Sequence, residues 1–266
     1  MSFDIRRLED GDDEDRPLRV LALGPHVDDV EIGCGATLLR LKRYHRAQVD
    51  VRVFSDHYAV PQHQDRSLEG RAAAELMGYD SLGFFQMRDT EFPAMARDLQ
   101  ERVAGLRDQL EPDLVLSPNA RDTHQDHVAL AQAIAREFRY GESIWCYEIN
   151  QFGTDYHFRP NLYLDVGLPS LSTLDGFVEC AAKREPLGHE NFMSGDATDG
   201  PIGAVLCEDT LAHEKIYILR KTMVTQAAKP LLKPEILSAI MVLRGMQASR
   251  RTRFAEAFDA RTIVHS

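Results

Sequence analysis

The alternation of strand-like and helix-like segments through the first half of the chain is the feature that most constrains its fold. Residues 18–24 form a short apolar run that ends at a Gly-Pro pair, a pattern typical of a buried parallel strand. Residues 33–46 then carry apolar side chains at helical spacing, and residues 48–55 alternate as a second strand does. This order predicts an α/β fold, with a Rossmann-like, mostly parallel sheet covered by helices on both faces.

The same alternation continues to about residue 166 and weakens beyond it. Further strands are predicted at 81–85, 113–117, 143–149 and 161–166, and further helices at 65–78, 94–110 and 127–138. Later in the chain we expect an irregular stretch at 184–212, helices at 207–226 and 234–246, and a last strand at 258–264. One domain is expected over 1–266, with an acidic tail at 1–17 and a divergent, insertion-like segment at 167–214.

Composition and charge argue against several classes of function. The chain has 31 Lys+Arg against 42 Asp+Glu, a formal net charge of −11, whereas a dedicated nucleic-acid binder needs a basic face. No apolar run approaches the ~20 residues of a membrane span, and the N-terminus lacks the apolar stretch of a signal peptide. The 4 cysteines are widely spaced and indicate neither a disulfide framework nor a thiolate zinc site. We therefore expect a cytoplasmic protein, and the sequence leaves a homo-oligomer open.

Two clusters of acidic residues and histidines directly follow predicted strands. The first contains His26, Asp28 and Asp29, after the first strand, and the second is the run Asp-Thr-His-Gln-Asp-His at 122–127, after the fourth strand. Loops that follow parallel strands lie at the carboxyl edge of the sheet, and in the usual order 3-2-1-4 the first and fourth strands are neighbours. We therefore expect the two clusters to face each other, although they are far apart in the sequence.

The residue types in these clusters favour a metal site. Two imidazoles and one carboxylate suit a divalent metal such as zinc, with a fourth position open for water. Asp28, beside the ligand Asp29, could serve as the base for that water, and the spare histidine with Asp126 could polarise the substrate. Taken one at a time, a loop histidine is more often a surface or hydrogen-bonded residue, and an Asp after a strand is often a helix cap. The meeting of two clusters favours the metal site over these alternatives.

Other motifs are incomplete. Residues 33–38 begin like a dinucleotide-binding fingerprint, but Leu38 occupies the third glycine position, so a nicotinamide cofactor is not expected. The sequence has no P-loop and no GxSxG nucleophile elbow, which removes support for a kinase or a serine hydrolase.

The two clusters resemble the motifs of the LmbE/PIG-L family of zinc-dependent N-acetyl-sugar deacetylases. The family patterns run approximately P-H-x-D-D-x-E-x-G-x-G and D-x-H-x-D-H, and residues 25–35 and 122–127 match them. Further similar segments are the helix with Arg66 and Glu69, the strand at 160–165, and the closing segments at 244–245 and 255–258. The resemblance covers roughly the first 166 residues.

The resemblance implies a role for each site residue. His26, Asp29 and His127 would be the zinc ligands, and Asp28 the general base. His124 would stabilise the oxyanion or protonate the leaving amine, with Asp126 orienting it. Arg66 would sit at the mouth and contact a phosphate or a sugar hydroxyl of the substrate; the alternative is an exposed helix residue paired with Glu69.

Three departures from the family concern the substrate pocket rather than the ligands. Val27 replaces the usual proline between His and Asp, residues 223–226 lack a histidine that the family often carries, and residues 167–214 look different from the usual segment.

The expected function is therefore a metal-dependent hydrolase that removes an N-acetyl group from an amino sugar or glycoconjugate. Its cofactor would be Zn²⁺ or another divalent metal, and its partner a small-molecule N-acetylated sugar, with no nucleic acid and no membrane span. Two alternatives are an amidase acting on a different N-acyl small molecule, such as a secondary-metabolite intermediate, and a non-catalytic metal- or sugar-binding protein.

Overall fold

The computed structural model describes residues 16–56, 66–139, 142–149, 158–187 and 205–261. Most of the predicted acidic tail and residues 188–204 of the predicted insertion lie outside these ranges. Among the residues that the structure describes, no helix is both long and apolar enough to cross a bilayer.

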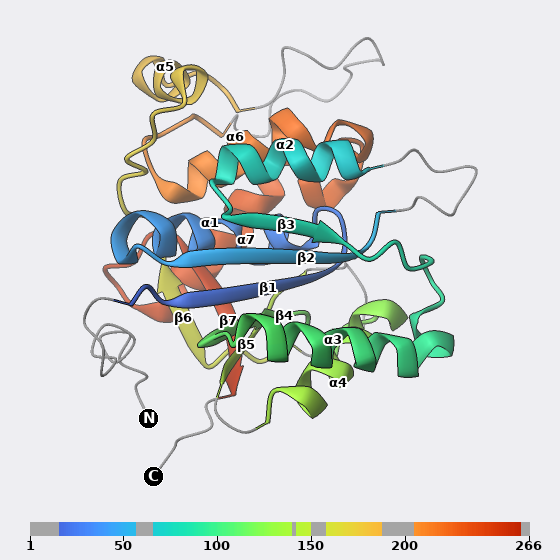
Figure 1. The fold of residues 1–266 in the computed structure, drawn as a ribbon. Helices are drawn as coiled ribbons and strands as arrows, with labels where there is room; N and C mark the ends of the chain where they lie inside the picture. Colours follow the sequence, from blue (N-terminus) through green and yellow to red (C-terminus); the bar gives the residue numbers. More distant parts are fainter. Residues whose placement is uncertain (1–15, 57–65, 140–141, 150–157, 188–204, 262–266) are drawn as a thin grey trace.

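A seven-stranded, mostly parallel sheet organises the fold (Figure 1), in the order β3-β2-β1-β4-β5-β7-β6. Its strands are β1 (Arg19–His26), β2 (Gln48–Ser55), β3 (Ser81–Phe84), β4 (Leu114–Ser117), β5 (Ser143–Tyr147), β6 (Leu162–Asp165) and β7 (Ala255–Arg261). The first five strands run parallel, and β7 is antiparallel to both β5 and β6. The predicted order 3-2-1-4 is confirmed, so β1 and β4 are neighbours at the point where the strand order reverses.

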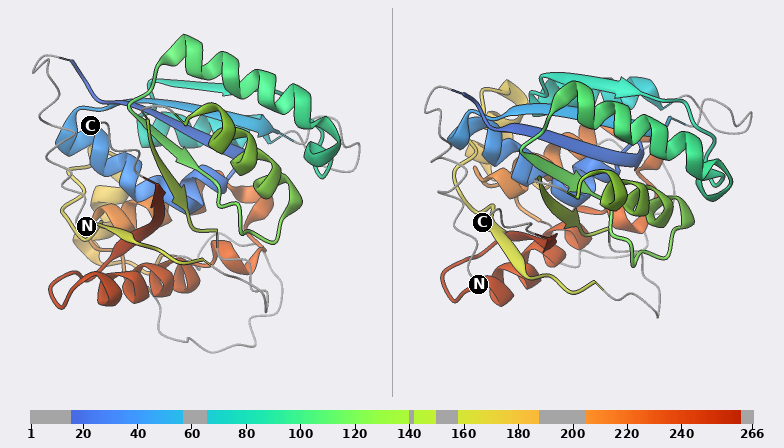
Figure 2. Two further views of the ribbon diagram at one scale, coloured as in Figure 1. Left: turned by 90° about the horizontal axis from the view of Figure 1, so that it is seen from below. Right: turned by 60° about the horizontal axis from the view of Figure 1, so that its bottom comes forward.

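Helices cover both faces of this sheet, as predicted. They are α1 (Asp29–His45), α2 (Ser67–Met77), α3 (Ala96–Leu110), α4 (Gln125–Glu137), α5 (Asp175–Lys183), α6 (Leu211–Thr222) and α7 (Pro234–Ala248), with short 3₁₀ turns η2 (Phe92–Met95), η3 (Val224–Gln226) and η4 (Pro230–Leu232). Figures 1 and 2 show α3 and α4 on one face and α1, α2, α6 and α7 on the other. Two apolar clusters result, because Val20 and Ala22 of β1 point into one and Leu21 and Leu23 into the other.

The second half of the chain departs from the expected boundaries. The segment 167–214 contains the helix α5, whose Gly176 and β-branched Val178 weaken its helix signal, although Phe177 and Cys180 pack into the core. The last strand begins at Ala255 rather than at residue 258. Its start was hidden because Glu256, a charged residue, is buried there, 4% exposed.

Candidate metal centre

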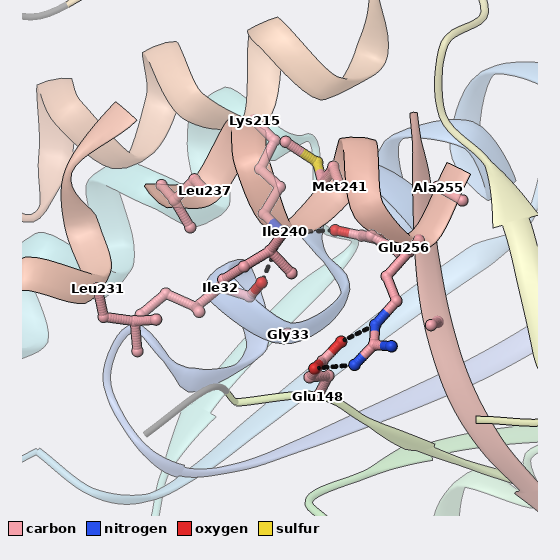
Figure 3. A pocket seen from close by; sticks show the side chains of 12 residues that line it. Ile32, Gly33, Glu148, Lys215, Leu231, Leu237, Ile240, Met241, Ala255 and Glu256 are labelled. Atoms are coloured by element: carbon pink, nitrogen blue, oxygen red, sulfur yellow. Dashed lines mark hydrogen bonds and ion pairs between the residues drawn. The ribbon is translucent and has the colours of Figure 1, made fainter. Parts of the chain in front are cut away.

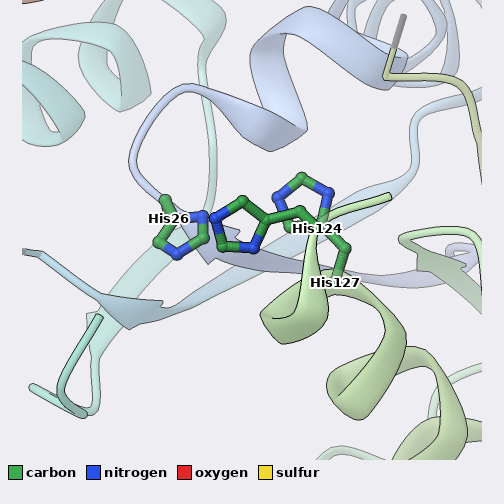
Figure 4. Close-up of side chains that lie close together, drawn as sticks. All are labelled: His26, His124 and His127. Atoms are coloured by element: carbon green, nitrogen blue, oxygen red, sulfur yellow. The ribbon is translucent and has the colours of Figure 1, made fainter. Parts of the chain in front are cut away.

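The two clusters meet at the carboxyl edge of the sheet, as the strand order predicts. His26 ends β1 and Asp29 begins α1, while α4 begins directly after His124. Three imidazole rings gather there (Figure 4): the centroid of the His124 ring lies 4.8 Å from those of His26 and His127, and the latter two are 5.4 Å apart. These three histidines each offer a ligand nitrogen, and the three nitrogens lie within 4.8 Å of one another.

Asp29 lies at the centre of this arrangement. Its Oδ2 is 3.1 Å from Nδ1 of His26 and 3.3 Å from Nε2 of His127, and it accepts a hydrogen bond from the backbone N of His26 at 2.9 Å. Asp29 is 6% exposed, and the two histidines are buried too. One imidazole nitrogen of each histidine therefore contacts the same buried carboxylate oxygen.

In His26 and His127, the ring nitrogen that does not contact Asp29 (the outer nitrogen) faces a second carboxylate. Nδ1 of His127 lies 2.9 Å from Oδ2 of Asp122. Nε2 of His26 lies 2.9 Å from Oδ1 of Asp89 and 3.3 Å from Oδ2 of Asp126. Histidines that bind metals usually donate their other N–H to a carboxylate in this way, which fixes the tautomer and the ring orientation. His26 and His127 thus have the carboxylate partners of metal-binding histidines, and a second group whose ligand atoms lie within 4.8 Å of one another is made by His26, Asp89, His124 and Asp126.

Charge in the site favours protonated rings when no cation is bound. Burial lowers the pKa of His26, but its hydrogen bonds, foremost that to Asp126, outweigh burial and hold this pKa well above 6.5. Burial also lowers the pKa of His127, but the charge of Asp29 outweighs it and raises the pKa to about 9. A metal ion that binds these rings must displace their protons.

His124 differs from the other two rings because it is the N-cap of α4. Its Nδ1 accepts a hydrogen bond from the backbone N of Asp126 at 3.2 Å, so the neutral ring carries its hydrogen on Nε2. Burial, followed by the charge of His26, lowers the pKa of His124 below its ordinary value. His124 is therefore a neutral hydrogen-bond donor, held by the helix terminus.

The carboxylate of Asp126 contacts His26 rather than His124. This side chain is fully buried and also accepts hydrogen bonds from the backbone N of Thr90 at 2.6 Å and of Phe92 at 3.2 Å. Asp126 therefore contacts His124 through its backbone N–H, which donates to Nδ1 of His124, and this hydrogen bond can orient the ring.

Asp28 occupies a strained backbone position beside the ligands. Its φ of 102° lies in the region that favours glycine, and a non-glycine residue held in a sparsely populated conformation costs roughly 1–3 kcal/mol. Oδ2 of Asp28 lies 3.0 Å from Nη2 of Arg66 and 3.7 Å from Nζ of Lys229. Arg66 is 3% exposed, so it contacts Asp28 from inside the protein and also approaches Glu69, at 3.5 Å.

Residues 21–137 match the family model described as PIG-L: GlcNAc-PI de-N-acetylase. This match covers 117 of the 266 residues of the chain. An Escherichia coli K12 protein described as uncharacterized deacetylase YaiS is 29% identical over 119 residues, a match that spans 43% of this chain and 64% of the relative.

Solved structures extend the likeness in fold beyond the PIG-L segment. The N,N'-diacetylchitobiose deacetylase from Pyrococcus horikoshii is similar with a TM-score of 0.60 and 16% identity, covering 97% of this chain and 87% of the other. GalB, the 4-carboxy-2-hydroxymuconate hydratase from Pseudomonas putida KT2440, is similar with a TM-score of 0.58 and 18% identity, covering 94% and 98%. At these identities the likeness establishes the shared fold.

The PIG-L segment contains all seven site residues expected from the sequence, and the structure adds Asp122, which pairs with His127, and two residues outside both motifs. Asp89 contacts His26 from the loop after β3, a carboxyl-edge position that could have suggested it. Lys229 reaches Asp28 from outside the family segment, and its sequence neighbourhood carries no signal of that contact.

Proposed function

We propose that the protein is a metal-dependent N-deacetylase, which hydrolyses an acetamide to acetate and a free amine. The convergence of Nδ1 of His26, Oδ2 of Asp29 and Nε2 of His127, with a carboxylate behind each ring, carries the proposal. This donor set leaves room in a tetrahedral site for a fourth ligand, as catalytic zinc sites do. The family description of residues 21–137 supports the reaction type.

The roles of the residues follow from their positions. A divalent metal bound by His26, Asp29 and His127 would supply Lewis acidity toward the amide carbonyl and lower the pKa of a water molecule. Asp28, adjacent in the chain to Asp29, accepts the proton of the attacking water. Arg66, 3.0 Å from Asp28, orients that carboxylate. The leaving nitrogen then takes up the proton that Asp28 accepted, and the products are acetate and the amine.

His124 is assigned to the oxyanion rather than to the leaving group. Its Nδ1 is occupied by the backbone N–H of Asp126, so Nε2–H is the group that it presents. A neutral donor aimed at developing negative charge is a standard means of stabilising a tetrahedral intermediate. A general acid would instead need a proton that a ring with a lowered pKa does not hold.

For the substrate, we infer an N-acetylated amino sugar or glycoconjugate. The family description names a GlcNAc derivative, and the Pyrococcus horikoshii neighbour is described as acting on a diacetylated chitobiose. Zinc is the proposed metal because two imidazoles and a carboxylate suit it. A cytoplasmic location, a single domain over the whole chain and a homo-oligomer stay predictions.

A hydratase is the second candidate function, because GalB shares the fold. An amidase acting on a different N-acyl compound is a third, motivated by the divergent segment 167–214. The test is acetate release by the zinc-loaded protein from a panel of N-acetyl sugars and other N-acetyl amines, with water addition to an unsaturated dicarboxylate measured in parallel.

We expect acetate release from N-acetyl sugars, its loss after chelation, and its loss in Asp28→Asn. Release from other N-acetyl amines alone would move the assignment to the amidase. Hydration without any acetate release would overturn the deacetylase proposal, and metal binding with no turnover on any substrate would leave the non-catalytic alternative.

A further inference from the structure

Helix α1 is broken directly after the turn that carries the site. Cys34 has φ −147° and ψ 17°, values outside the helical region, so α1 consists of a first turn that begins at Asp29 and a second, longer part. In an unbroken helix, the backbone N–H of Ala36 would donate to the C=O of Ile32, and that of Thr37 to the C=O of Gly33. The non-helical Cys34 lies between the acceptors and the donors of these two bonds.

A buried ion pair, formed by residues of two other elements, contacts the backbone around Cys34 (Figure 3). Nζ of Lys215, on α6, donates to the C=O of Ile32 at 2.5 Å. Glu256, on β7, accepts from the backbone N of Ala36 at 3.2 Å and of Thr37 at 2.7 Å. Lys215 and Glu256 contact each other at 2.6 Å. The pair thus contacts the backbone on both sides of Cys34, with Lys215 at the C=O of Ile32 and Glu256 at the N–H groups of Ala36 and Thr37.

The same contacts reach the catalytic turn through the backbone of one residue, Ile32. The backbone N–H of Ile32 donates to the C=O of Asp28 at 2.8 Å, and the C=O of Ile32 accepts from Lys215. A continuous series of hydrogen bonds therefore runs from the backbone of Asp28 to Glu256. Glu256 also acts as the N-cap of the second part of α1, supplied from another element.

A buried ion pair has a large desolvation cost. Lys215 is 2% exposed and Glu256 is 4% exposed, and the desolvation of two charges commonly cancels their attraction. The pair is specific in its orientation. The ammonium group can pair only with the C=O at the break, and the carboxylate only with the N–H groups. Exchange of the two charges, or an apolar filling, would leave buried backbone groups without partners.

We propose that Lys215 and Glu256 are positioning residues of the metal centre, which hold the break in α1 and so fix the turn that carries Asp28 and Asp29. The inference rests on the proposed function and adds to it two residues that lie outside the family segment. Neither residue touches a ligand nitrogen or oxygen. Both act through the backbone of Ile32 and the helix start at Ala36.

The test uses Lys215→Met, Glu256→Gln and the double variant. Zinc affinity is measured by competition with a chromophoric chelator, and amide hydrogen exchange of residues 28–37 is measured in the metal-free protein. Outer-sphere partners of metal ligands typically contribute 10- to 100-fold in affinity, and we expect zinc binding to weaken about 10-fold in each variant, with faster exchange in this turn. In the double variant no buried charge is left unpaired, so stability recovers relative to the single variants while zinc binding stays weak.

Glu214→Gln is the matched control. Glu214 is fully buried and pairs with Arg43, so it also joins α6 to α1, but at the far end of α1 from the break. We expect this variant to lose thermal stability while its zinc affinity stays within about twofold of the wild type.

Equal weakening in Glu214→Gln and Glu256→Gln would show that general destabilisation is responsible and would overturn the inference. Unchanged zinc affinity and unchanged exchange in the double variant would do the same. If the wild type itself binds no zinc, the proposed function fails, and hydrogen exchange alone still decides whether the pair holds the turn.

Discussion

At the scale of single residues, carboxylates decide what each histidine of the site can do. Asp122 faces the outer nitrogen of His127, and Asp89 and Asp126 face that of His26. His124 instead receives a backbone N–H, so it alone of the three is a neutral donor toward the site. Three chemically identical side chains thus acquire two different roles from their partners.

The number of protons released on metal binding tests whether His26 and His127 are metal ligands. The pKa of His127 is raised to about 9 and that of His26 is raised well above 6.5, so both rings are protonated at pH 7 in the metal-free protein. Zinc binding at pH 7 should release about two protons from these rings, and the apparent affinity should fall as the pH is lowered. Calorimetry in two buffers of different ionisation enthalpy measures the number. Release of no protons would contradict the assignment.

Replacement of His124 tests its role in the reaction. Because loss of one oxyanion donor costs roughly 10²–10³ in kcat, His124→Ala should lose about that much. Zinc affinity should be nearly unchanged, since His124 is not one of the three proposed ligands. Steady-state kinetics and chelator competition check the two parts. A variant that no longer binds zinc would place His124 among the ligands instead.

At the scale of elements, Gly33 determines how closely the start of α1 approaches the sheet. A Cβ atom on Gly33 would lie 2.3 Å from Cδ2 of Tyr147, whose hydroxyl donates to the C=O of Leu23 at 2.8 Å. The first turn of α1 can therefore approach β5 and β1 closely only because residue 33 has no side chain. This contact keeps the ligand-bearing turn against the sheet edge.

Gly33→Ala should consequently destabilise the protein. Overpacking a close contact typically costs about 1–3 kcal/mol, and urea unfolding of the metal-free protein measures the change. Gly105→Ala is the control, because nothing lies within 4 Å of a Cβ atom at that position in α3. It should stabilise by up to about 1 kcal/mol through helix propensity. A Gly33→Ala variant as stable as the control would show that Tyr147 moves aside without cost.

The elements that the sequence predicted well are those with local signals. Strands β1 and β4 are apolar runs, β2 alternates, and the motifs that follow β1 and β4 lie at the sheet edge as predicted. The start of β7 was missed because Glu256 breaks its pattern, and only the distant Lys215 explains that burial. Lys229 has no local signal, because its contact with Asp28 forms only after the chain folds, whereas Asp89 follows a parallel strand and its position could have suggested it.

At the scale of the whole molecule, one buried histidine couples stability to pH away from the site. His213, on α6, is 2% exposed, and its Nδ1 lies 2.7 Å from Oγ1 of Thr210. Burial lowers the pKa of His213 to about 4, against an ordinary value of 6.5. The native state thus keeps this ring neutral over a range in which the unfolded chain protonates it.

The contribution of His213 to the free energy of unfolding should therefore decline as the pH falls from 6.5 to 4, whereas that of Glu31, whose pKa burial raises to about 7, should rise as the pH falls from 7 to 4.5. The contribution of His213 is fully present above pH 6.5 and is lost progressively down to about pH 4, a difference of about 3 kcal/mol. His213→Gln should remove this part of the pH dependence, which urea titrations at pH 7 and pH 4.5 measure. An identical pH dependence in the variant and the wild type would show that His213 does not set it.

The central claim is a metal centre made by His26, Asp29 and His127 where two distant motifs meet. The most direct test is the metal content of the purified protein after reconstitution with zinc and removal of excess metal, compared between the wild type and Asp29→Ala. The account predicts about one zinc ion per wild-type chain and almost none in Asp29→Ala, with the variant still folded by circular dichroism. A wild type that retains no metal, or a folded Asp29→Ala protein that retains as much as the wild type, would contradict it.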